Sequence, residues 1–519
     1  MQVAWLVWGM IAAASAVGIA VLVRTRWLQS RTLEKCVALS VGIHVVLAAV
    51  CALVGGFSPA SWGTRDDGPM AMTVVMCTEP EADATPADAA EVAEPSADVA
   101  ADAATEPSPP PALVPIAQAE PADLVPLLDV AADAEPAASE KATQPPVAAP
   151  PAPQPKVPEV YADRTESRRA AAAAERGGSV ETEQAVQAAL AWLAAAQAAD
   201  GRWNAARHGA GRARQVEGQH HASVGAQSDH GVTGLALLAF LGAGSTHRTG
   251  DHAQQVESGL RFLLSRQRAD GSLAGDAEFF AALYCHGMAT LALAECTALT
   301  ADDSLRPALD RAVRHTLAMQ HPLTGGWRYA AGDRGDTSQL GWQVMVLASA
   351  RQAGMGGLEP AEARARTFLQ SVSSGQAGGL AAYRAGERPS MAMTAEALVC
   401  RMFLGMPVDH PAAAEALAMI GGSLPDRARP NAYAWYYATL ASFHAGGPQW
   451  ERWNASLQAA LLPLQRRDAG SLAGSWDPDP VWGMHGGRVY ATALAAMTLE
   501  VYYRYLPMHR QPGRLAQAP

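Results

Sequence analysis

The chain is poor in charge, and most of the charge it has lies in one segment. Charged residues make up 17% of the 519 residues, and the formal net charge is -11. Residues 78–160 hold 16 acidic residues against two lysines, a net charge of -14, so the remainder carries about +3 (-11 minus -14). No basic cluster offers the electrostatic footprint of a nucleic-acid-binding protein. We therefore expect no nucleic-acid partner and assign the acidic excess to a solvated segment.

The sequence also lacks paired cysteines of the kinds that bind zinc or form disulfides. It has six cysteines and no Cys-x-x-Cys pair, the usual sequence signal for a zinc site. Cys36 and Cys51 lie in apolar segments. Cys285 and Cys296 would share one helix about 16 Å apart, which is too far for a disulfide. We predict free, mostly buried thiols, no metal and no cofactor.

Two long uncharged apolar stretches open the chain. Residues 3–23 and 36–57 are each long enough to cross a bilayer as a helix. Basic residues follow the first stretch, between residues 24 and 35, whereas a signal peptide carries its positive charge before the apolar part. Positive charge marks the cytoplasmic side of a membrane protein. We predict a two-helix membrane anchor over residues 1–57, in a bacterial-type inner membrane, with both termini and the rest of the chain outside the cytoplasm.

A proline- and alanine-rich segment follows the predicted anchor. Residues 78–160 hold 18 of the 35 prolines and almost no aromatic residues, so they cannot bury enough apolar surface to offset the entropy of ordering. Such a segment is extended and would reach up to ~250 Å. We assign residues 58–178 to a disordered linker, whose last part, 161–178, has the alanines and arginines of a helical lead-in. Residues 508–519 are expected to be a disordered tail.

A repeated unit occupies the rest of the chain, residues 179–507. Each copy has an amphipathic helix that ends at a glutamine, a turn through glycine, often a tryptophan or leucine, and a more apolar helix. The period of about 50 residues indicates repeated supersecondary units. A degenerate copy lies at residues 376–380, and a copy near residue 424 has lost the motif. The clearest turns are Gln197, Gly201 and Trp203; Gln267, Gly271 and Leu273; Gln320, Gly326 and Trp327; and Gln465, Gly474 and Trp476.

Two kinds of helix alternate along this region. Val256, Leu260 and Leu263 fall on one face of a half-buried helix, whereas residues 235–241 are apolar all round, as in a fully buried helix. Their alternation indicates two concentric layers. We predict an all-α fold, a six-hairpin α/α toroid over residues 179–507. Its inner helices are expected to begin near Asp229, Ala281, Asp336, Ser390, Pro430 and Gly487.

The glutamine–glycine–tryptophan turns resemble the QW repeats of the squalene cyclase and protein prenyltransferase β-subunit superfamily, also called the prenyltransferase/squalene oxidase repeat. The resemblance covers about 330 of the 519 residues. It implies that the glutamine satisfies backbone groups at a helix end and that the tryptophan packs over the turn. Because these roles are structural, the turns indicate a fold and leave the chemistry open.

The catalytic signatures of the resembling families are missing. Squalene cyclases carry an Asp-x-Asp-Asp acid motif, prenyltransferases an Asp-x-Cys pair of zinc ligands, and thioester domains a Cys with a Glu-Gln pair shortly after it. None of these runs occurs in residues 179–507. The nearest acid pairs, at 333–336, 276–278 and 477–479, lie in glycine- or proline-rich turns where capping is expected. The sequence therefore favours a toroid without the catalysis of these families.

Polar and aromatic residues at the expected starts of the inner helices are candidates for a ligand-binding or active site. The Asp-His and Cys-His pairs at 229–230 and 285–286 have metal-ligand chemistry, although capping and hydrogen-bonding roles are the expectation. An aromatic-lined, partly polar cavity suits an apolar or a carbohydrate ligand. Alternatively, the aromatic residues fill the barrel. The cavity candidates are Asp229, His230, His286, Asp336, Glu396 and His485, with Trp342, Tyr433, Trp435, Tyr436 and Tyr490 as aromatic neighbours.

These features lead to one expected function and two alternatives. The first is a membrane-anchored, extracytoplasmic toroid that binds a ligand or a protein partner, with no catalytic residues assigned. The second is an enzyme with its own site at the barrel mouth, acting on a terpenoid, a lipid or a polysaccharide. The third is a TonB-like structural protein, in which anchor, spacer and terminal domain span an envelope. Polar groups that converge on a cavity favour the first two, and a filled barrel favours the third.

Overall fold

The computed structural model describes residues 157–212, 215–216, 219–220, 224–468 and 470–508. The predicted anchor, the linker up to residue 156 and the tail from residue 509 lie outside the described residues. The described chain is mainly helical. It also contains two short strand pairs, β1 (Gln215–Val216) with β2 (Gln219–His220) and β3 (Ser373–Ser374) with β4 (Leu380–Ala381).

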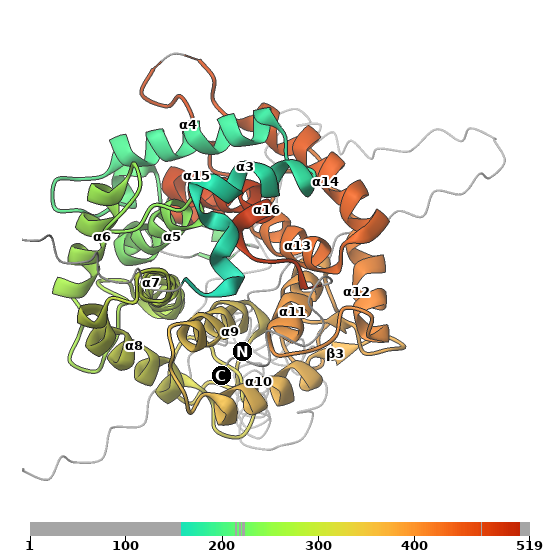
Figure 1. The fold of residues 1–519 in the computed structure, drawn as a ribbon. Helices are drawn as coiled ribbons and strands as arrows, with labels where there is room; N and C mark the ends of the chain where they lie inside the picture. The colour runs from blue at the N-terminus through green and yellow to red at the C-terminus, as the bar shows by residue number, and fades with distance from the viewer. Residues whose placement is uncertain (1–156, 213–214, 217–218, 221–223, 469, 509–519) are drawn as a thin grey trace, which may run out of the picture. The chain divides into compact units, whose positions relative to one another are not determined.

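Within the described residues, six inner helices form a closed ring. They are α5 (Asp229–Gly242), α7 (Phe279–Thr300), α9 (Thr337–Gln352), α11 (Met391–Phe403), α13 (Ala432–Ala445) and α15 (Gly483–Leu499). Each packs against the next, and α15 packs against α5, which closes the ring (Figure 1). Neighbours on every side require apolar residues all round, and in α5 every residue from His230 to Gly242 is buried.

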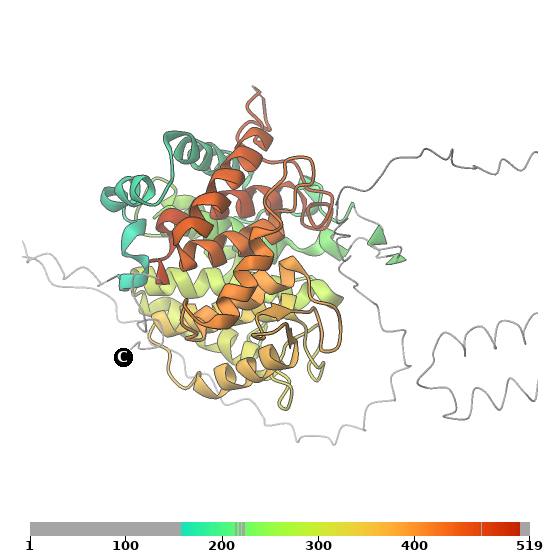
Figure 2. The same ribbon diagram turned by 90° about the vertical axis from the view of Figure 1, so that its right-hand side faces the viewer.

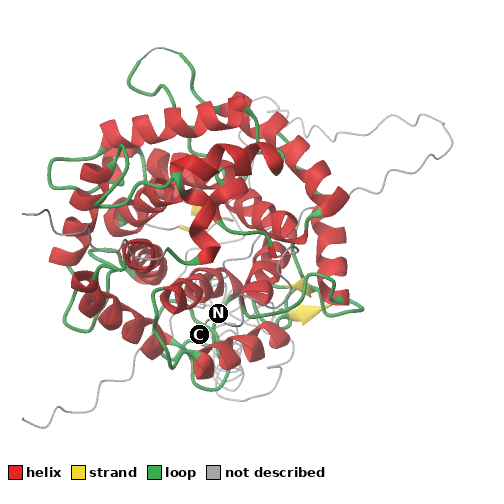
Figure 3. Cartoon of the chain, in the orientation of Figure 1, coloured by secondary structure: helices red, strands yellow, loops and turns green. Residues whose placement is uncertain are grey.

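Six outer helices of the described chain surround this ring (Figure 3), and Figure 2 shows the toroid from the side. They are α4 (Val180–Ala196), α6 (Ala253–Ser265), α8 (Arg306–Met319), α10 (Glu359–Ser371), α12 (Pro411–Gly421) and α14 (Gly447–Leu461). Each buries one face, as α6 does with Val256, Leu260 and Leu263. Short 3-10 turns lie between the helices: η2 (Ala206–His208), η3 (Val224–Gln227), η4 (Asp303–Leu305) and η5 (Leu462–Leu464).

This arrangement confirms the predicted all-α toroid of six helical hairpins. The starts of α5, α9 and α11 coincide with the expected residues or follow them by one, and α7 and α13 begin within two residues. The largest difference is at α15, which begins at Gly483 rather than near Gly487. Gly487 has a non-helical φ of 74° inside the helix, so the expected start is the site of a kink.

Glutamines join successive outer helices at four of the turns in the described chain. Each side-chain amide donates to the glycine carbonyl of its own turn and to a carbonyl near the start of the following outer helix, at 2.8–3.1 Å. The last bond returns to α4, so these contacts join the last outer helix to the first. The acceptors are Gly201 and Gln255 for Gln197, Gly271 and Ala308 for Gln267, Gly325 and Ala361 for Gln320, and Gly474 and Ala185 for Gln465.

The glycines of these four turns allow the close approach of the next helix. Gly201, Gly271, Gly325 and Gly474 have φ values of 80–91°. A β-carbon at any of them would lie 1.9–2.2 Å from a backbone oxygen of the following outer helix. In the third turn this residue is Gly325, rather than the Gly326 singled out in the sequence, because the extra residue of that turn shifts the left-handed position by one.

The two ends of the toroid differ. The inner helices begin at one end, which we call the mouth, and they end at the other, which we call the rear. At the rear, η1 (Glu159–Arg164), α3 (Glu166–Glu175) and α16 (Val501–Arg504) cover the ring (Figure 1). Arg164 and Arg504 lie 2.6 and 3.3 Å from the Glu295 carboxylate of α7. Burial opposes the ionisation of Glu295, but the two guanidiniums hold its pKa below the ordinary value.

The predicted linker end at residue 178 is therefore too late. Tyr161 and Arg164 are each 1% exposed, and the Tyr161 hydroxyl donates a hydrogen bond to Ser349 Oγ of α9. The alanines of α3 also pack on the toroid, with Ala172 and Ala173 buried. Arg164 is buried against Glu295, and Arg176 pairs with Asp163. The periodicity of the sequence does not show such pairs.

Among the described residues, α7 is the helix with the length and apolar character to span a membrane. It belongs to the inner ring, where most of it is buried. The predicted spans at residues 3–23 and 36–57 lie outside the described residues.

Candidate functional site

Asp336 is the central acidic residue of the mouth, and the start of α9 fixes its position. It is the N-cap residue of α9, where Oδ1 accepts hydrogen bonds from the Gln339 backbone amide at 2.8 Å and the Ser338 hydroxyl at 3.0 Å. The Arg328 guanidinium nitrogen Nε lies 3.3 Å from Oδ2. The Asp336 side chain is fully buried. Capping occupies Oδ1, and Oδ2 faces the side chains of the mouth.

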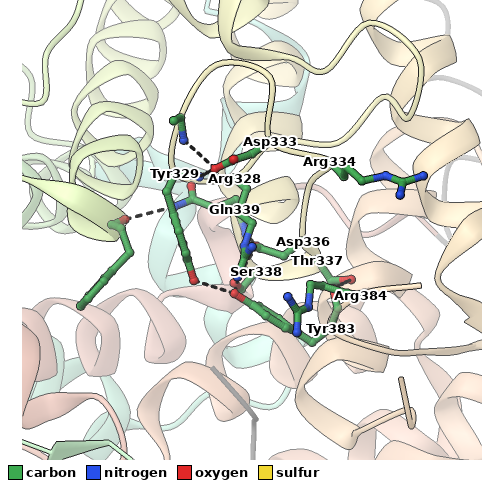
Figure 4. Close-up of polar contacts among 12 residues, drawn as sticks. Arg328, Tyr329, Asp333, Arg334, Asp336, Thr337, Ser338, Gln339, Tyr383 and Arg384 are labelled. Atoms are coloured by element: carbon green, nitrogen blue, oxygen red, sulfur yellow. Dashed lines mark hydrogen bonds and ion pairs between the residues drawn. The ribbon is translucent and has the colours of Figure 1, made fainter. Parts of the chain in front are cut away.

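Two tyrosines connect Asp336 with the surface of the mouth. The Tyr383 hydroxyl donates to Asp336 Oδ2 at 3.0 Å, and the Tyr329 hydroxyl oxygen lies 2.7 Å from that of Tyr383 (Figure 4). Because Tyr383 gives its one proton to the carboxylate, Tyr329 must be the donor to Tyr383. Tyr329 is partly exposed, so a directed chain of hydrogen bonds runs from the surface to a buried carboxylate.

A second chain of hydrogen bonds reaches Asp336 from α7. The Tyr284 hydroxyl lies 2.5 Å from Ser338 Oγ, and Ser338 donates to Asp336. Tyr284 is therefore the donor to Ser338. Beside this chain, the buried Oε1 of Gln339 has no hydrogen-bond partner among the described residues. Two hydroxyl chains from different elements thus converge on one carboxylate, next to an unpaired acceptor.

Glu396 of α11 is the second buried carboxyl of this end of the ring. The Tyr433 hydroxyl of α13 donates a hydrogen bond to its Oε2. On its other side the carboxyl lies against the backbone of α9, where Gly341 has no side chain. Glu396 is fully buried, and Tyr433 is 9% exposed. Three neighbouring inner helices therefore supply the acidic residue, its donor and the space it occupies.

Burial makes both carboxyls weaker acids than usual. Burial raises the pKa of Asp336 to about 6, although the hydrogen bonds from Gln339, Tyr383 and Ser338 act to lower it. Burial also raises the pKa of Glu396 well above its ordinary value, and the nearby Asp336 charge raises it further. The two carboxyls are therefore coupled, because a negative charge on Asp336 favours the protonated form of Glu396.

Aromatic residues fill the ring below these carboxyls. Trp342 and Tyr436 stack with ring centroids 6.3 Å apart and planes 9° apart, and Tyr437 packs edge-on against both. All three side chains are at most 1% exposed, and Trp435 is also buried. The interior of the ring is therefore packed with side chains, while the polar groups lie at its mouth.

The segment before α15 forms part of the rim. Asp479 accepts hydrogen bonds from the amides of Val481 and Trp482 at 2.9 and 3.0 Å, which fixes this segment. His485 contacts Trp482 and Phe280 through its ring, with centroid distances of 5.6 and 6.3 Å. His485 and Trp482 are both partly exposed. His485 thus lies on an aromatic rim beside the start of α7.

Asp229 and His230 contact residues outside the inner ring rather than the polar groups of the mouth. Asp229 Oδ1 accepts a hydrogen bond from the Ala205 amide at 2.7 Å, and Oδ2 pairs with Arg202 at 2.9 Å. The His230 ring packs on Phe262 of α6 at 4.9 Å. Burial lowers the pKa of His230 to about 4, so its imidazole is neutral at pH 7.

His286 has a structural partner in the second repeat. The backbone amide of Leu273 donates to its Nδ1 at 3.1 Å, and Nε2 lies 3.0 Å from the Thr316 hydroxyl. The ring is therefore neutral with its proton on Nε2. In the same way, the Thr233 hydroxyl accepts a hydrogen bond from the Trp203 backbone amide, and the Thr492 hydroxyl accepts one from the Trp476 backbone amide. His286 thus replaces the threonine of other repeats.

Of the six candidates from the sequence, Asp336 and Glu396 are buried at the mouth ends of neighbouring inner helices and interact electrostatically. His485 lies on the rim, and Asp229, His230 and His286 contact other partners. Among the described residues no three His, Cys, Asp or Glu side chains are placed to hold a metal ion. The sequence reasoning missed the residues that complete the mouth, although an Arg-Tyr pair directly after Trp327 and a tyrosine shortly after the next turn were a signal. They are Tyr284, Arg328, Tyr329, Ser338 and Tyr383.

Comparison with known proteins gives matches in structure alone. No family model and no curated protein matches the chain. The α-1,6-mannanase GH76A of Salegentibacter sp. HEL1_6 is 11% identical, with a TM-score of 0.44, over 62% of this chain and 98% of that one. The type II terpene cyclase MstE from Scytonema is 16% identical, with a TM-score of 0.40, over 62% and 98%. An unsaturated glucuronyl hydrolase specific for heparin is 12% identical, with a TM-score of 0.42, over 62% and 96%. These values are too low to assign the chain to any of these families.

Proposed function

We propose that the mouth of the toroid is a carbohydrate-binding site. The observation that carries this proposal is the convergence of two hydroxyl chains on Asp336, one through Tyr329 and Tyr383 and one through Tyr284 and Ser338. Sugar hydroxyls donate hydrogen bonds, and Tyr284 and Tyr329, which give their own protons to the inner groups, keep their phenol oxygens as acceptors at the partly exposed end of each chain. Tyrosine rings at the edge provide flat apolar surfaces for the faces of sugar rings.

The packing of the ring favours a sugar over a long isoprenoid chain. An isoprenoid needs an apolar cavity that encloses most of its surface. Trp342, Tyr436 and Tyr437 occupy the middle of the ring and contact one another. A ligand at the mouth therefore meets polar groups, whereas the apolar interior is already filled.

We also propose that the toroid is displayed outside the cytoplasm on a membrane anchor. The two uncharged stretches at residues 3–23 and 36–57 and the basic residues between them support this orientation. The acidic, proline-rich segment would hold the domain away from the bilayer. An envelope polysaccharide is then the carbohydrate within reach of the mouth.

The binding proposal is tested with the full chain in detergent. Calorimetric titration with neutral oligosaccharides is compared with titration with farnesol. We expect an oligosaccharide to bind, and Tyr329→Phe and Tyr383→Phe to weaken it about tenfold, because each loses a hydrogen bond next to a charged group. Tyr161→Phe is the matched control, since its hydroxyl binds Ser349 at the rear. Farnesol as the tighter ligand, or equal affinity in the three variants, contradicts the proposal.

A second candidate is acid–base catalysis on the same sugar. It is favoured by one observation: burial raises the pKa of Asp336 to about 6, and the charge of Asp336 helps to raise the pKa of Glu396 above its ordinary value. In this candidate Glu396 protonates a leaving oxygen and Asp336 activates water. Glu396→Gln would then lower the rate at which reducing ends are released about 100-fold or more, and the affinity for the oligosaccharide would be preserved. Unchanged hydrolysis in this variant excludes the catalytic candidate and leaves the binding proposal intact.

A further inference from the structure

The junction between α10 and α12 lacks the glutamine contact that joins other outer helices. Its turn is the degenerate copy at residues 376–380. Here the carboxylate of Glu415, on α12, accepts hydrogen bonds from the backbone amides of Gln376, Ala377 and Gly379 at 2.6, 3.0 and 2.7 Å. The turn is thus held by a side chain of the following helix instead of a bridging glutamine amide.

An open groove of about 490 Å³ lies at this junction. Its volume is within the range of small-molecule sites. Arg366 of α10 and Arg401 of α11 line it together with His410, and Leu369 and Met406 contribute apolar surface. None of the residues that line the groove is acidic. The groove therefore combines two cations with an apolar floor.

The two guanidiniums are held in place by neutral acceptors. Arg401 donates to the Gly379 carbonyl and to Ser373 Oγ, both at 2.7 Å, and Arg366 donates to the Leu404 carbonyl at 2.8 Å. Burial lowers the pKa of Arg401, and the Glu415 charge offsets this only in part. The carboxylate of Glu415, whose charge acts on Arg401, makes its hydrogen bonds to the amides of the turn rather than to a guanidinium.

We propose that this groove binds a small amphiphilic anion. A carboxylate or phosphate head group would lie between Arg366 and Arg401, where fixed guanidiniums favour paired hydrogen bonds to planar or tetrahedral oxyanions. An apolar body would cover Leu369, Leu404 and Met406, which line the same groove. This site is separate from the mouth and shares none of its residues, so the failure of one proposal leaves the other standing.

The test is calorimetric titration of the full chain with octanoate and octyl phosphate, each below its micellar concentration. Octanol lacks the charge, and inorganic phosphate lacks the apolar body. Arg366→Gln removes an exposed guanidinium that lines the groove, and Arg261→Gln on α6, where the arginine is 68% exposed, is the matched control. Ala377→Phe fills the groove without changing its charge.

We expect one or both amphiphilic anions to bind more tightly than octanol and inorganic phosphate. Which of the two binds better identifies the head group. Arg366→Gln should weaken binding about tenfold or more, Ala377→Phe should abolish it, and Arg261→Gln should leave it unchanged. If octanol bound equally well, the proposal that a charged head group is required would be overturned. If inorganic phosphate bound equally well, the proposal that an apolar body is required would be overturned. Full affinity in Arg366→Gln or Ala377→Phe would overturn the site.

Discussion

Glu396 of α11 rests against Gly341 of α9, in the space where any other residue would place its side chain. A β-carbon at position 341 would lie 1.9 Å from Glu396 Oε1 and 2.7 Å from its carboxyl carbon. The absence of one methyl group on α9 therefore determines where the buried acid of the neighbouring helix lies.

Gly341→Ala is expected to displace Glu396 and to destabilise the toroid. Alanine favours a helix over glycine, but the forced movement of a fully buried carboxyl costs more, and we expect a net loss of about 1–3 kcal/mol. Gly356→Ala is the control, because a β-carbon there meets nothing within 4 Å. The measurement is urea unfolding of both variants. Equal stability of the two would show that the Glu396 position is adaptable.

The pKa of Asp336 predicts a specific pH dependence of stability. Its pKa is about 6 in the folded state and 3.8 as the ordinary value, so the folded state binds its proton more tightly between these pH values. Stability from this group is therefore greatest below pH 3.8 and is lost as pH rises to 6, by about 3 kcal/mol in total. Asp336→Asn should remove that loss. Unfolding free energies at pH 4 and 7 measure it, and an unchanged difference between them would contradict the assignment.

His286 predicts the opposite dependence. Burial lowers its pKa to about 3, so the unfolded chain gains a proton below pH 6.5 and the folded chain does not. Stability is lost as pH falls from 6.5 toward 3, by about 2 kcal/mol at pH 5 from this residue. His286→Thr introduces the threonine that other repeats have at this position, as Thr233 and Thr492 show, and should reduce the loss of stability as pH falls. A decline as steep as that of the parent chain would show that other groups control acid sensitivity.

The glutamine contacts between outer helices predict a contrast between two similar substitutions. Gln267 donates to two carbonyls and accepts from Arg311, so Gln267→Ala should cost about 2–3 kcal/mol. Gln376 lies in the degenerate turn, where its backbone amide binds Glu415, and Gln376→Ala should cost less than about 0.5 kcal/mol. Thermal unfolding of both variants measures the difference. Similar losses would show that the side-chain bridges add little.

The rear of the toroid predicts where the folded domain begins. A chain that starts at residue 157 should fold, whereas one that starts at residue 179 loses Arg164 and leaves Glu295 with less compensation for its burial. Removing one partner of a buried ion pair costs about 3–5 kcal/mol. Circular dichroism and thermal unfolding of the two chains provide the measurement. Equal stability would place residues 157–178 outside the folding unit.

The fold was predictable because its signals are local and repeated. Helix periodicity and the Gln–Gly–Trp turns recur at one spacing, and each turn fixes a glutamine contact that depends on few residues. The kink at Gly487 and the folded lead-in at 157–178 were not predictable in this way. Each depends on a long-range partner, such as the ion pair of Arg164 with Glu295.

The candidate site was predictable only in part. Asp336 and Glu396 were identified from their place at the starts of inner helices, and the same criterion also selected Asp229 and His230. At the start of an inner helix, one side faces the axis of the toroid and the other faces the outer helices. The sequence around residues 229–230 does not show which of these sides each side chain faces. Tyr383 lies beyond the helix start, in the turn of the next repeat, so its contact with Asp336 follows from the closed ring.

The entry of the chain at the rear has a consequence for how the toroid is carried. Residues 157–164 attach to the ends of the inner helices, opposite the mouth, through Arg164 and Tyr161. A load applied along the preceding chain is therefore taken up by buried charge pairs on the far side from Asp336. The polar mouth therefore lies at the end of the toroid opposite to the one that residues 157–164 occupy.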